Sequence, residues 1–125
     1  MKTRESTENY LKTILILQHQ LGQVRSIDVA NTLKVSKPSV SNAVKKLRNE
    51  GLVEMDVCRH LVLTPKGHRY ASAVFERHAI IERFLTDVLS VDKETAHNDS
   101  CRLEHLVSAE TFLQIREAYE KSKNQ

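Results

Sequence analysis

The sequence has 125 residues, 40% of them hydrophobic and 28% charged, which fits one compact unit, or one with a small appendage, and excludes a disordered chain. No run approaches the roughly 18 apolar residues that a membrane-spanning helix needs, and two cysteines are too few for a disulfide framework. With three glycines, two prolines and no signal-peptide-like start, we expect a helix-rich protein of the cytoplasm with no membrane partner.

Three helices are predicted in the first half of the chain from apolar residues at helical spacing. They are expected over Thr7–Gln20, Ile27–Leu33 and Lys37–Asn49. Gly22 can end the first helix in the left-handed conformation, and Ser26 can cap the second. Ser36 is a good N-cap for the third helix, whose first turn tolerates Pro38 because the N–H that proline lacks has no helical partner there.

A hairpin and three further helices are predicted in the second half of the chain. The β-prone runs are Leu52–Asp56 and Leu61–Leu63. The helices are expected from Pro65 to about Leu89, from Asp92 to Val107, and over Ala109–Glu120. Their candidate N-caps are Thr64, Asp92 and Ser108, because these side chains can accept a hydrogen bond from the first helical turn.

Positive charge is concentrated in the first half. Residues 1–50 carry nine Lys or Arg against four Asp or Glu, whereas residues 51–125 carry ten against twelve. Between Arg25 and Asn49, Asp28 is the only acidic residue beside six basic ones. A solvated basic helix face is the ordinary explanation of such a run, but the contrast between the two halves favours a basic half that meets a polyanion.

Residues 26–63 have the pattern of a winged helix-turn-helix: a short helix, a turn, a second helix with a polar outer face, and a hairpin. The N-terminal end of the second helix usually enters the major groove, where its polar side chains suit base edges, whereas basic side chains farther along suit phosphates. The alternative is an ordinary three-helix core with a polar surface. The predicted DNA-binding residues are Arg25, Ser36, Lys37, Pro38, Ser39, Ser41, Asn42, Lys45, Lys46, Arg59 and His60.

Four potential metal ligands fall within an arc of about 100° on the helix predicted from Asp92. They are His97, Cys101, Glu104 and His105. A second pair, His78 and Glu82, lies four residues apart on the preceding helix. Each residue alone would more often be a surface or capping residue. Together, nitrogen, sulfur and carboxylate ligands on matched helix faces suit a borderline divalent transition metal.

The two motifs together resemble the diphtheria-toxin-repressor family of metal-dependent transcriptional regulators, which includes the manganese-transport regulators. The resemblance is carried by residues 7–14, 36–41, 63–67, 77–85 and 97–105. It implies a mainly α fold with a small β wing. The expected domains are a winged helix-turn-helix DNA-binding domain over residues 1–63 and a helical dimerisation and metal-binding domain over residues 64–125.

The resemblance also implies two neighbouring metal positions. One would be held by His78, Glu82 and His97, and the other by Cys101, Glu104 and His105. A cysteine at position 101 resembles the iron-responsive branch, since the manganese-responsive branch has a carboxylate there. Fe(II) is therefore the favoured metal and Mn(II) the second, with Co(II), Ni(II) or Zn(II) as substitutes in vitro.

Two features depart from the family pattern. The first helix of the family supplies a methionine or an aspartate where this chain has Asn9, and the manganese branch adds a glutamate where this chain has Lys12. Asn9 is a candidate ligand through its carbonyl oxygen, whereas Lys12 would repel a cation. Because the sequence stops near Gln125, we also expect it to lack the SH3-like C-terminal domain of longer iron-branch members.

The sequence thus predicts a homodimeric, sequence-specific DNA-binding repressor that a divalent metal activates and that controls metal homeostasis, rather than an enzyme. Its partners would be double-stranded operator DNA and a second copy of the chain, with no organic ligand. The main alternative is a winged-helix regulator that no longer responds to metal. A small metal-dependent hydrolase using Cys101, Glu104 and His105 is a further alternative, although no nucleophile in an elbow-like turn is recognisable.

Overall fold

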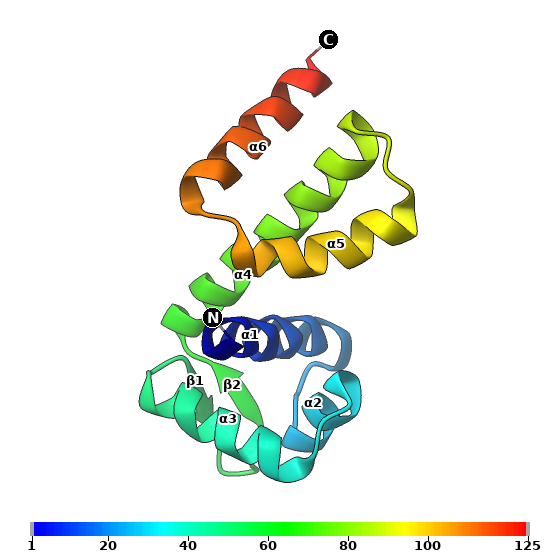
Figure 1. The fold of residues 1–125 in the computed structure, drawn as a ribbon. Coiled ribbons are helices and arrows are strands. Elements are labelled where there is room, and N and C mark those ends of the chain that lie inside the picture. The colour runs from blue at the N-terminus through cyan, green and yellow to red at the C-terminus, as the bar shows by residue number, and fades with distance from the viewer. Residues whose placement is uncertain (1, 125) are drawn as a thin grey trace. The chain divides into compact units, whose positions relative to one another are not determined.

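The structure is a computed structural model that describes residues 2–124, with side chains from Ser6 onward (Figure 1). It is mainly helical with one two-stranded sheet, which confirms the predicted fold class. Its elements are α1 (Lys2–Leu21), α2 (Ser26–Leu33), α3 (Lys37–Asn49), β1 (Val53–Met55), β2 (Leu61–Leu63), α4 (Pro65–Arg83), the π-helix η1 (Phe84–Val88), α5 (Lys93–Leu106) and α6 (Ala109–Lys123). None of the described helices is long and apolar enough to cross a membrane.

The chain divides into two compact units, Met1–Ser72 and Ala73–Gln125. This boundary falls inside α4, nine residues after the end of the DNA-binding domain predicted at residue 63. The predicted domain boundary between residues 63 and 64 stays a prediction. The two compact units are defined by contacts within the structure, and such units need not coincide with functional domains.

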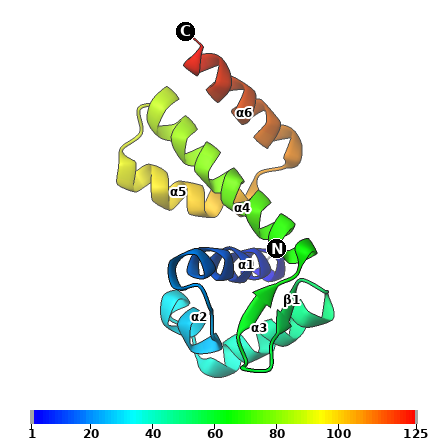
Figure 2. The ribbon, with the colours of Figure 1, turned by 180° about the vertical axis from the view of Figure 1, so that it is seen from behind.

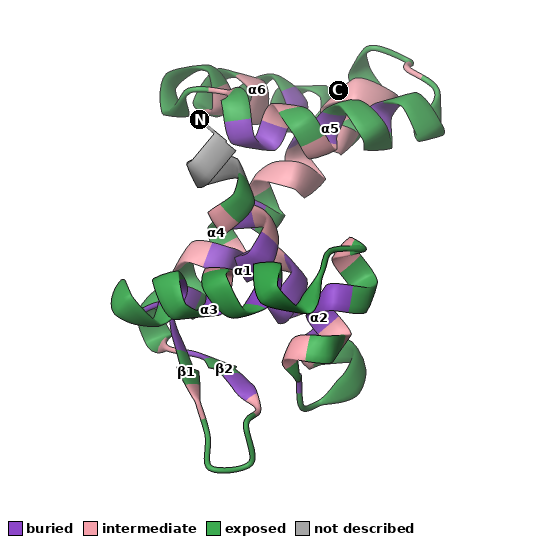
Figure 3. Cartoon of the chain, turned by 60° about the horizontal axis from the view of Figure 1, so that its bottom comes forward, coloured by how far each residue is buried: buried purple, intermediate pink, exposed green. Residues whose placement is uncertain are grey.

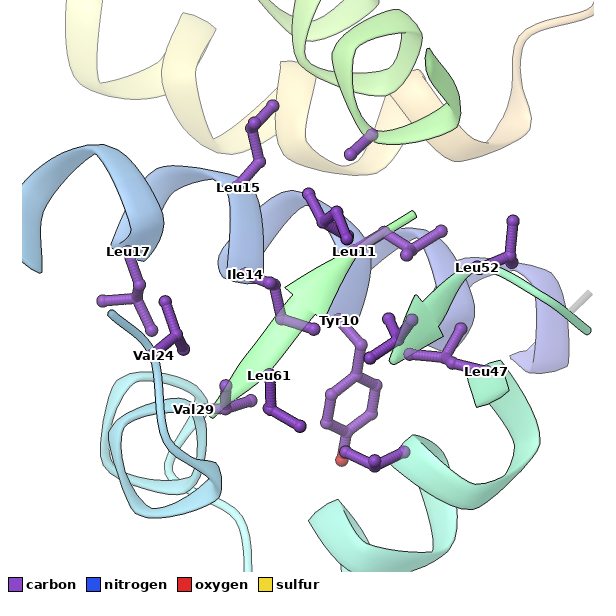
Figure 4. Packing of buried hydrophobic residues seen from close by; sticks show 14 of the residues in the cluster. Tyr10, Leu11, Ile14, Leu15, Leu17, Val24, Val29, Leu47, Leu52 and Leu61 are labelled. Carbon is purple, nitrogen blue, oxygen red and sulfur yellow. The ribbon is translucent and has the colours of Figure 1, made fainter. Parts of the chain in front are cut away.

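The first unit is built around α1, whose apolar stripe packs against α2, α3 and the hairpin (Figure 4). Leu11 and Ile14 of α1 are fully buried, as are Val29 of α2 and Val40 of α3. The remaining apolar stripe of α3 continues through Val44 and Leu47, which are also buried. Because one side of α3 supplies these core contacts, its opposite side is left for solvent.

The turns around α2 and α3 follow from a few local interactions. Gly22 (φ 81°) and Lys34 (φ 57°) adopt the left-handed conformation that ends a helix. The Ser36 side chain accepts a hydrogen bond from the Ser39 N–H at 3.2 Å, which confirms it as the N-cap of α3. The predicted cap at Ser26 is wrong. Arg25 is the N-cap residue, and its backbone N–H donates to Asp28 Oδ2 at 2.9 Å.

The antiparallel hairpin pairs Val53 with Leu63 and Met55 with Leu61. We call this hairpin, residues 53–63, the wing. Thr64 fixes its base: its Oγ1 donates to the carbonyl of Gly51 at 2.6 Å and accepts from the N–H of Gly67 at 3.0 Å. Thr64 thereby caps α4 as predicted and ties the start of that helix to the base of the wing.

In the second unit, α5 and α6 both contact η1, which continues directly from α4 (Figures 1 and 2). The caps predicted at Asp92 and Ser108 are confirmed, because their side chains accept backbone N–H bonds from the first turns of α5 and α6. Helix α6 reaches Lys123, three residues beyond the predicted end at Glu120. The π-helix was not predicted.

Candidate metal centre and nucleic-acid interface

Two histidines meet at one carboxylate in the second unit. Glu82 Oε1 lies 3.0 Å from His78 Nε2, one turn earlier on α4, and 2.9 Å from His97 Nδ1 on α5. The two imidazole rings are 5.3 Å apart between centroids and nearly perpendicular. The residues proposed from sequence for the first metal position therefore lie within contact distance of one another, although they come from two helices.

Cys101 extends this group along α5. Its Sγ lies 3.9 Å from His97 Nε2, one turn earlier on the helix. One ligand atom each of His78, His97 and Cys101 lies within 4.8 Å of the other two. Such spacing allows a single ion to contact all three, since metal–nitrogen bonds of about 2.0 Å and metal–sulfur bonds of about 2.3 Å place ligands 3–4 Å apart.

Glu104 and His105 form the buried side of the cluster. The Glu104 side chain is fully buried and that of His105 is 1% exposed, with 3.4 Å between Glu104 Oε1 and His105 Nε2. Glu104 Oε2 also lies 3.7 Å from His78 Nδ1. His78 therefore adjoins both predicted metal positions. By contrast, the His97 side chain is 59% exposed.

The electrostatics of the cluster favour an ionised Glu82. Burial of this carboxyl opposes ionisation, but the hydrogen bond from His97 and the charges of His78 and His97 outweigh it and lower the pKa of Glu82 below its ordinary value. An ionised carboxylate that lies against two imidazoles is also suited to bind a metal ion.

The donor set fits a divalent transition metal. Imidazole nitrogens, a thiol and carboxylates converge from α4 and α5, and imidazole with thiolate is a combination that Mg²⁺ and Ca²⁺ do not select. We name His78, Glu82, His97, Cys101, Glu104 and His105 the metal cluster.

Asn9, the remaining predicted ligand, lies in α1 and belongs to the other unit. It is half-buried and, together with Ser6, Tyr10, Leu33 and Val35, lines a surface pocket. Its participation in metal binding stays a prediction. Lys12 lies one turn later on α1 and is also half-buried.

Two residues that the sequence analysis missed support the metal cluster. Ser100 is fully buried, and its Oγ donates to the carbonyl of His97 at 3.0 Å while lying 3.5 Å from both His78 Nδ1 and Glu82 Oε1. Arg77 donates from Nη1 to the carbonyl of Glu104 at 2.6 Å, which ties α4 to the last turn of α5. The available sequence signal was that Arg77 and Ser100 lie within residues 77–85 and 97–105, two of the segments that carry the family resemblance.

The predicted DNA-reading face is exposed in the first unit. Figure 3 shows α3 with an exposed outer side, and Pro38, Ser41, Asn42, Lys45 and Lys46 are all exposed there. No acidic residue occurs in α3. The helix therefore offers hydrogen-bonding groups near its N-terminus and positive charge farther along, which suits base edges and phosphates respectively.

A surface hollow of about 350 Å³ lies beside this face. Its lining residues come from the starts of α2 and α3 and from the wing, and they are Arg25, Ser26, Ile27, Lys37, Ser41, Met55 and Arg59. Three of the seven are basic and were predicted DNA contacts. Their convergence on one hollow makes a positively charged surface that continues from helix to wing.

Ser36, Ser39 and His60 are already engaged in local hydrogen bonds. Ser36 caps α3, and its Oγ is 2.8 Å from Ser39 Oγ. His60 Nδ1 is 3.0 Å from Asp56 Oδ2 in the turn of the wing. Their roles as DNA contacts stay predictions. Asp56, which the sequence analysis did not single out, organises this turn; an aspartate at the start of a tight turn was the signal for it.

Comparison with known proteins gives matches along most of the chain. A model described as the N-terminal DNA binding domain of iron dependent repressors matches residues 2–61, and one described as their metal binding and dimerisation domain matches residues 64–125. The transcriptional regulator MntR of Escherichia coli O157:H7 is 41% identical over 113 residues, which are 90% of this chain and 72% of that protein.

The diphtheria toxin repressor of Corynebacterium glutamicum is 35% identical over 113 residues, 90% of this chain and 50% of that protein. The chain thus spans about half the length of that relative. Among solved structures, the manganese regulator SloR is 33% identical with a TM-score of 0.79, and the metal-dependent transcriptional regulator MtsR is 28% identical with a TM-score of 0.84. Both matches cover 91% of this chain and 53% of the other.

Proposed function

Because the chain belongs to the iron-dependent repressor family, as its sequence predicted, we propose that it is a transcriptional repressor whose binding to operator DNA depends on a divalent metal ion. The observation that carries this proposal is the convergence of His78, Glu82, His97 and Cys101 within one unit of a chain whose other unit presents a basic helix-turn-helix. We place it among cytoplasmic regulators rather than enzymes, since its named relatives are regulators.

The metal cluster would hold the ion through side chains of α4 and α5. Fe(II) is the favoured metal and Mn(II) the second, because the Cys101 thiolate is softer than a carboxylate and harder cations prefer oxygen ligands. Relatives are named for both metals: the repressor IdeR of Mycobacterium leprae as iron-dependent, and SloR as a manganese regulator. Co(II), Ni(II) or Zn(II) would substitute in vitro.

The DNA partner would be a duplex with two half-sites, read by two copies of the chain. The N-terminal residues of α3 would enter the major groove, and the wing and the lysines of α3 would contact phosphates. In a symmetric dimer the two half-sites lie about 34–36 Å apart, or a multiple of this spacing. No organic ligand is included in this mechanism.

Metal and DNA would be coupled by linkage. An ion that binds the DNA-competent arrangement more tightly than the others raises the population of that arrangement. The same coupling requires that operator DNA raises the affinity for the metal by an equal factor. Because the two factors must be equal, measuring both affinities checks that the metal and DNA titrations are consistent with each other.

To test the proposal, operator DNA is first selected from random sequences. It is then titrated anaerobically with the protein, once without metal and once each with Fe(II), Mn(II), Co(II) or Zn(II). We expect a gain in specific affinity that Cys101→Ala and His97→Ala abolish. His97 and Cys101 are preferable to His105, because His105 is buried and its removal also disturbs packing. Equal affinity with and without every metal would contradict the proposal and favour a regulator that does not respond to metal.

The role of position 9 can be tested in the same assay. Asn9→Asp adds a hard anionic oxygen, so we expect it to shift the response toward Mn(II) relative to Fe(II). Lys12→Glu should act in the same direction by removing a positive charge. An unchanged Mn(II) to Fe(II) ratio in both variants would exclude position 9 from the metal site.

A further inference from the structure

The turn of the wing places three different ligand types side by side, outside the metal cluster. Asp56, Cys58 and His60 alternate along the turn between β1 and β2. One ligand atom of each residue lies within 4.8 Å of the other two. A carboxylate, a thiol and an imidazole therefore converge within five consecutive residues.

Backbone hydrogen bonds hold this arrangement in place. Asp56 Oδ1 accepts the backbone N–H of Cys58 at 2.9 Å and that of His60 at 2.8 Å. The Arg59 N–H donates to the Asp56 carbonyl at 3.0 Å, and Arg59 takes a left-handed φ of 64° that reverses the chain. The His60 backbone bond is also the main cause that lowers the pKa of Asp56.

The three side chains differ in exposure in a way that suits an ion arriving from solvent. His60 is 12% exposed and Asp56 is 41% exposed, with 3.0 Å between His60 Nδ1 and Asp56 Oδ2. Cys58 is exposed at the outside of the turn. The Asp56–His60 pair alone would close the turn, so the thiol is not needed for the local fold. Its convergence with the pair is the feature that indicates a ligand.

We propose that Asp56, Cys58 and His60 form a second metal site at the tip of the wing, for a borderline divalent ion of the Zn(II) type. Oxygen, sulfur and nitrogen from three protein residues leave a fourth tetrahedral position for water. Binding requires the thiolate, so Cys58 releases one proton as the ion enters. The site is separate from the metal cluster, which lies in the other unit.

The charge balance gives the site a consequence for DNA. Without metal, the tip carries the negative charge of Asp56 and the positive charge of Arg59. With the ion bound, two positive charges meet one carboxylate and one thiolate, so the net charge of the tip rises by one. This consequence rests on the proposed function, because it requires that the wing approaches phosphates. The metal binding itself does not.

Cobalt(II) absorbance tests the site without DNA, since thiolate coordination produces a charge-transfer band. The full-length Cys101→Ser variant leaves Cys58 as the only thiol. We expect this reduced, metal-free variant to bind one equivalent of Co(II) with a thiolate band, and Zn(II) to displace it. Adding His60→Gln or Asp56→Asn should weaken the affinity for the Co(II) ion that produces the thiolate band by at least about tenfold. Glu54→Gln, at an exposed carboxylate on β1, is the matched control and should leave it unchanged.

Two results of the cobalt experiment would contradict the proposed wing site. Absence of a thiolate band in Cys101→Ser at cobalt concentrations that saturate the parent would overturn the proposal. A band that His60→Gln and Asp56→Asn leave intact would also overturn it, because it would assign cobalt to an isolated cysteine. The Asp56→Asn substitution retains a side-chain oxygen for the two backbone bonds, so an unchanged circular dichroism spectrum is expected for that variant.

A DNA measurement then tests the consequence separately. In the Cys101→Ser background, Zn(II) should raise affinity for non-operator DNA and steepen its salt dependence by about one phosphate contact. The added Cys58→Ser substitution should remove this effect. If cobalt binds as expected but DNA affinity does not change, the wing site stands and its placement near phosphates is wrong.

Discussion

Glu82 Oε1 lies 3.0 Å from Nε2 of His78, one helical turn before it on α4. The two residues are four positions apart on the same helix, a spacing at which side chains lie next to each other. When His78 is protonated this contact is an ion pair, and the same two side chains are candidate ligands for a metal ion. The proposed metal site therefore uses groups that also contribute to stability.

The first prediction concerns the acid sensitivity of the metal-free protein. The pKa of Glu82 lies below its ordinary value of 4.5, so its ionisation stabilises the fold above about that pH, and this contribution disappears as the pH falls through the lowered pKa. Glu82→Gln should therefore lower the free energy of unfolding near neutral pH, by at most about 1 kcal/mol for a partly exposed pair.

Urea unfolding in the presence of a chelator, repeated from pH 7 to about pH 3, measures this difference. The curves for Glu82→Gln and the parent should converge at the acid end. Glu117→Gln, at an exposed position on α6, serves as the control and should follow the parent throughout. A deficit in Glu82→Gln that stays constant across the pH range would show that packing rather than charge is responsible.

The second prediction separates sequence reading from general affinity on α3. Asn42 and Lys46 are both exposed, four residues apart. Asn42→Ala should weaken binding to the operator by about 1–3 kcal/mol and leave non-operator DNA nearly unaffected, because an amide reads a base edge. Lys46→Ala should weaken binding to all sequences and reduce the salt slope by about one. Equal losses on both DNAs for Asn42→Ala would place the reading face elsewhere.

The third prediction concerns Gly67, in the first turn of α4. A Cβ at this position would overlap the carbonyl oxygen of Leu52, a backbone atom that cannot move aside cheaply. In an open helix, glycine to alanine stabilises by about 1 kcal/mol. Here Gly67→Ala should instead destabilise by about 2–3 kcal/mol in urea unfolding. A variant with a higher free energy of unfolding than the parent would contradict the close approach of Gly67 to the Leu52 carbonyl.

The fourth prediction concerns self-association. Leu106 and Leu113 are 55% and 53% exposed in the second unit, and the family model that matches residues 64–125 is one for dimerisation. Because these exposed leucines lie in the segment that the dimerisation model matches, we predict that they belong to the partner surface. Leu106→Glu and Leu113→Glu should shift the protein to monomers in analytical ultracentrifugation, whereas Val57→Glu, at the fully exposed wing tip, should not. Dimers that persist in both leucine variants would move the interface elsewhere.

Local features of the fold were predictable because they depend on neighbouring residues. Ser36, Asp92 and Ser108 were recognised as caps from their chemistry and from the apolar residues that follow them. The error at Ser26 has a physical cause. Asp28 accepts the N–H of Arg25, which makes Arg25 the cap residue, and Ser26 is only one position later. The π-helix Phe84–Val88 was missed because its composition does not distinguish it from an α-helix.

The candidate metal site was also only partly predictable from the sequence. Residues on one face of α5 could be grouped by helical geometry, but the contact between Glu82 and His97 depends on how α5 packs in the second unit. Helical periodicity contains no information about that packing. The burial of Glu104 and His105 was equally out of reach, since spacing alone treats all residues of one face alike.

The unequal exposure of the metal cluster would set an order for exchange of a bound ion. His97, with 59% of its side chain exposed, and Glu82 are within reach of solvent, whereas Glu104 and His105 are almost fully enclosed. A hydrated ion would lose its first water molecules to His97 and Glu82, and its last to the enclosed pair. A competing chelator would reach the ion from the same side, so His97→Ala should speed the loss of metal to a chelator as well as weaken metal binding at equilibrium.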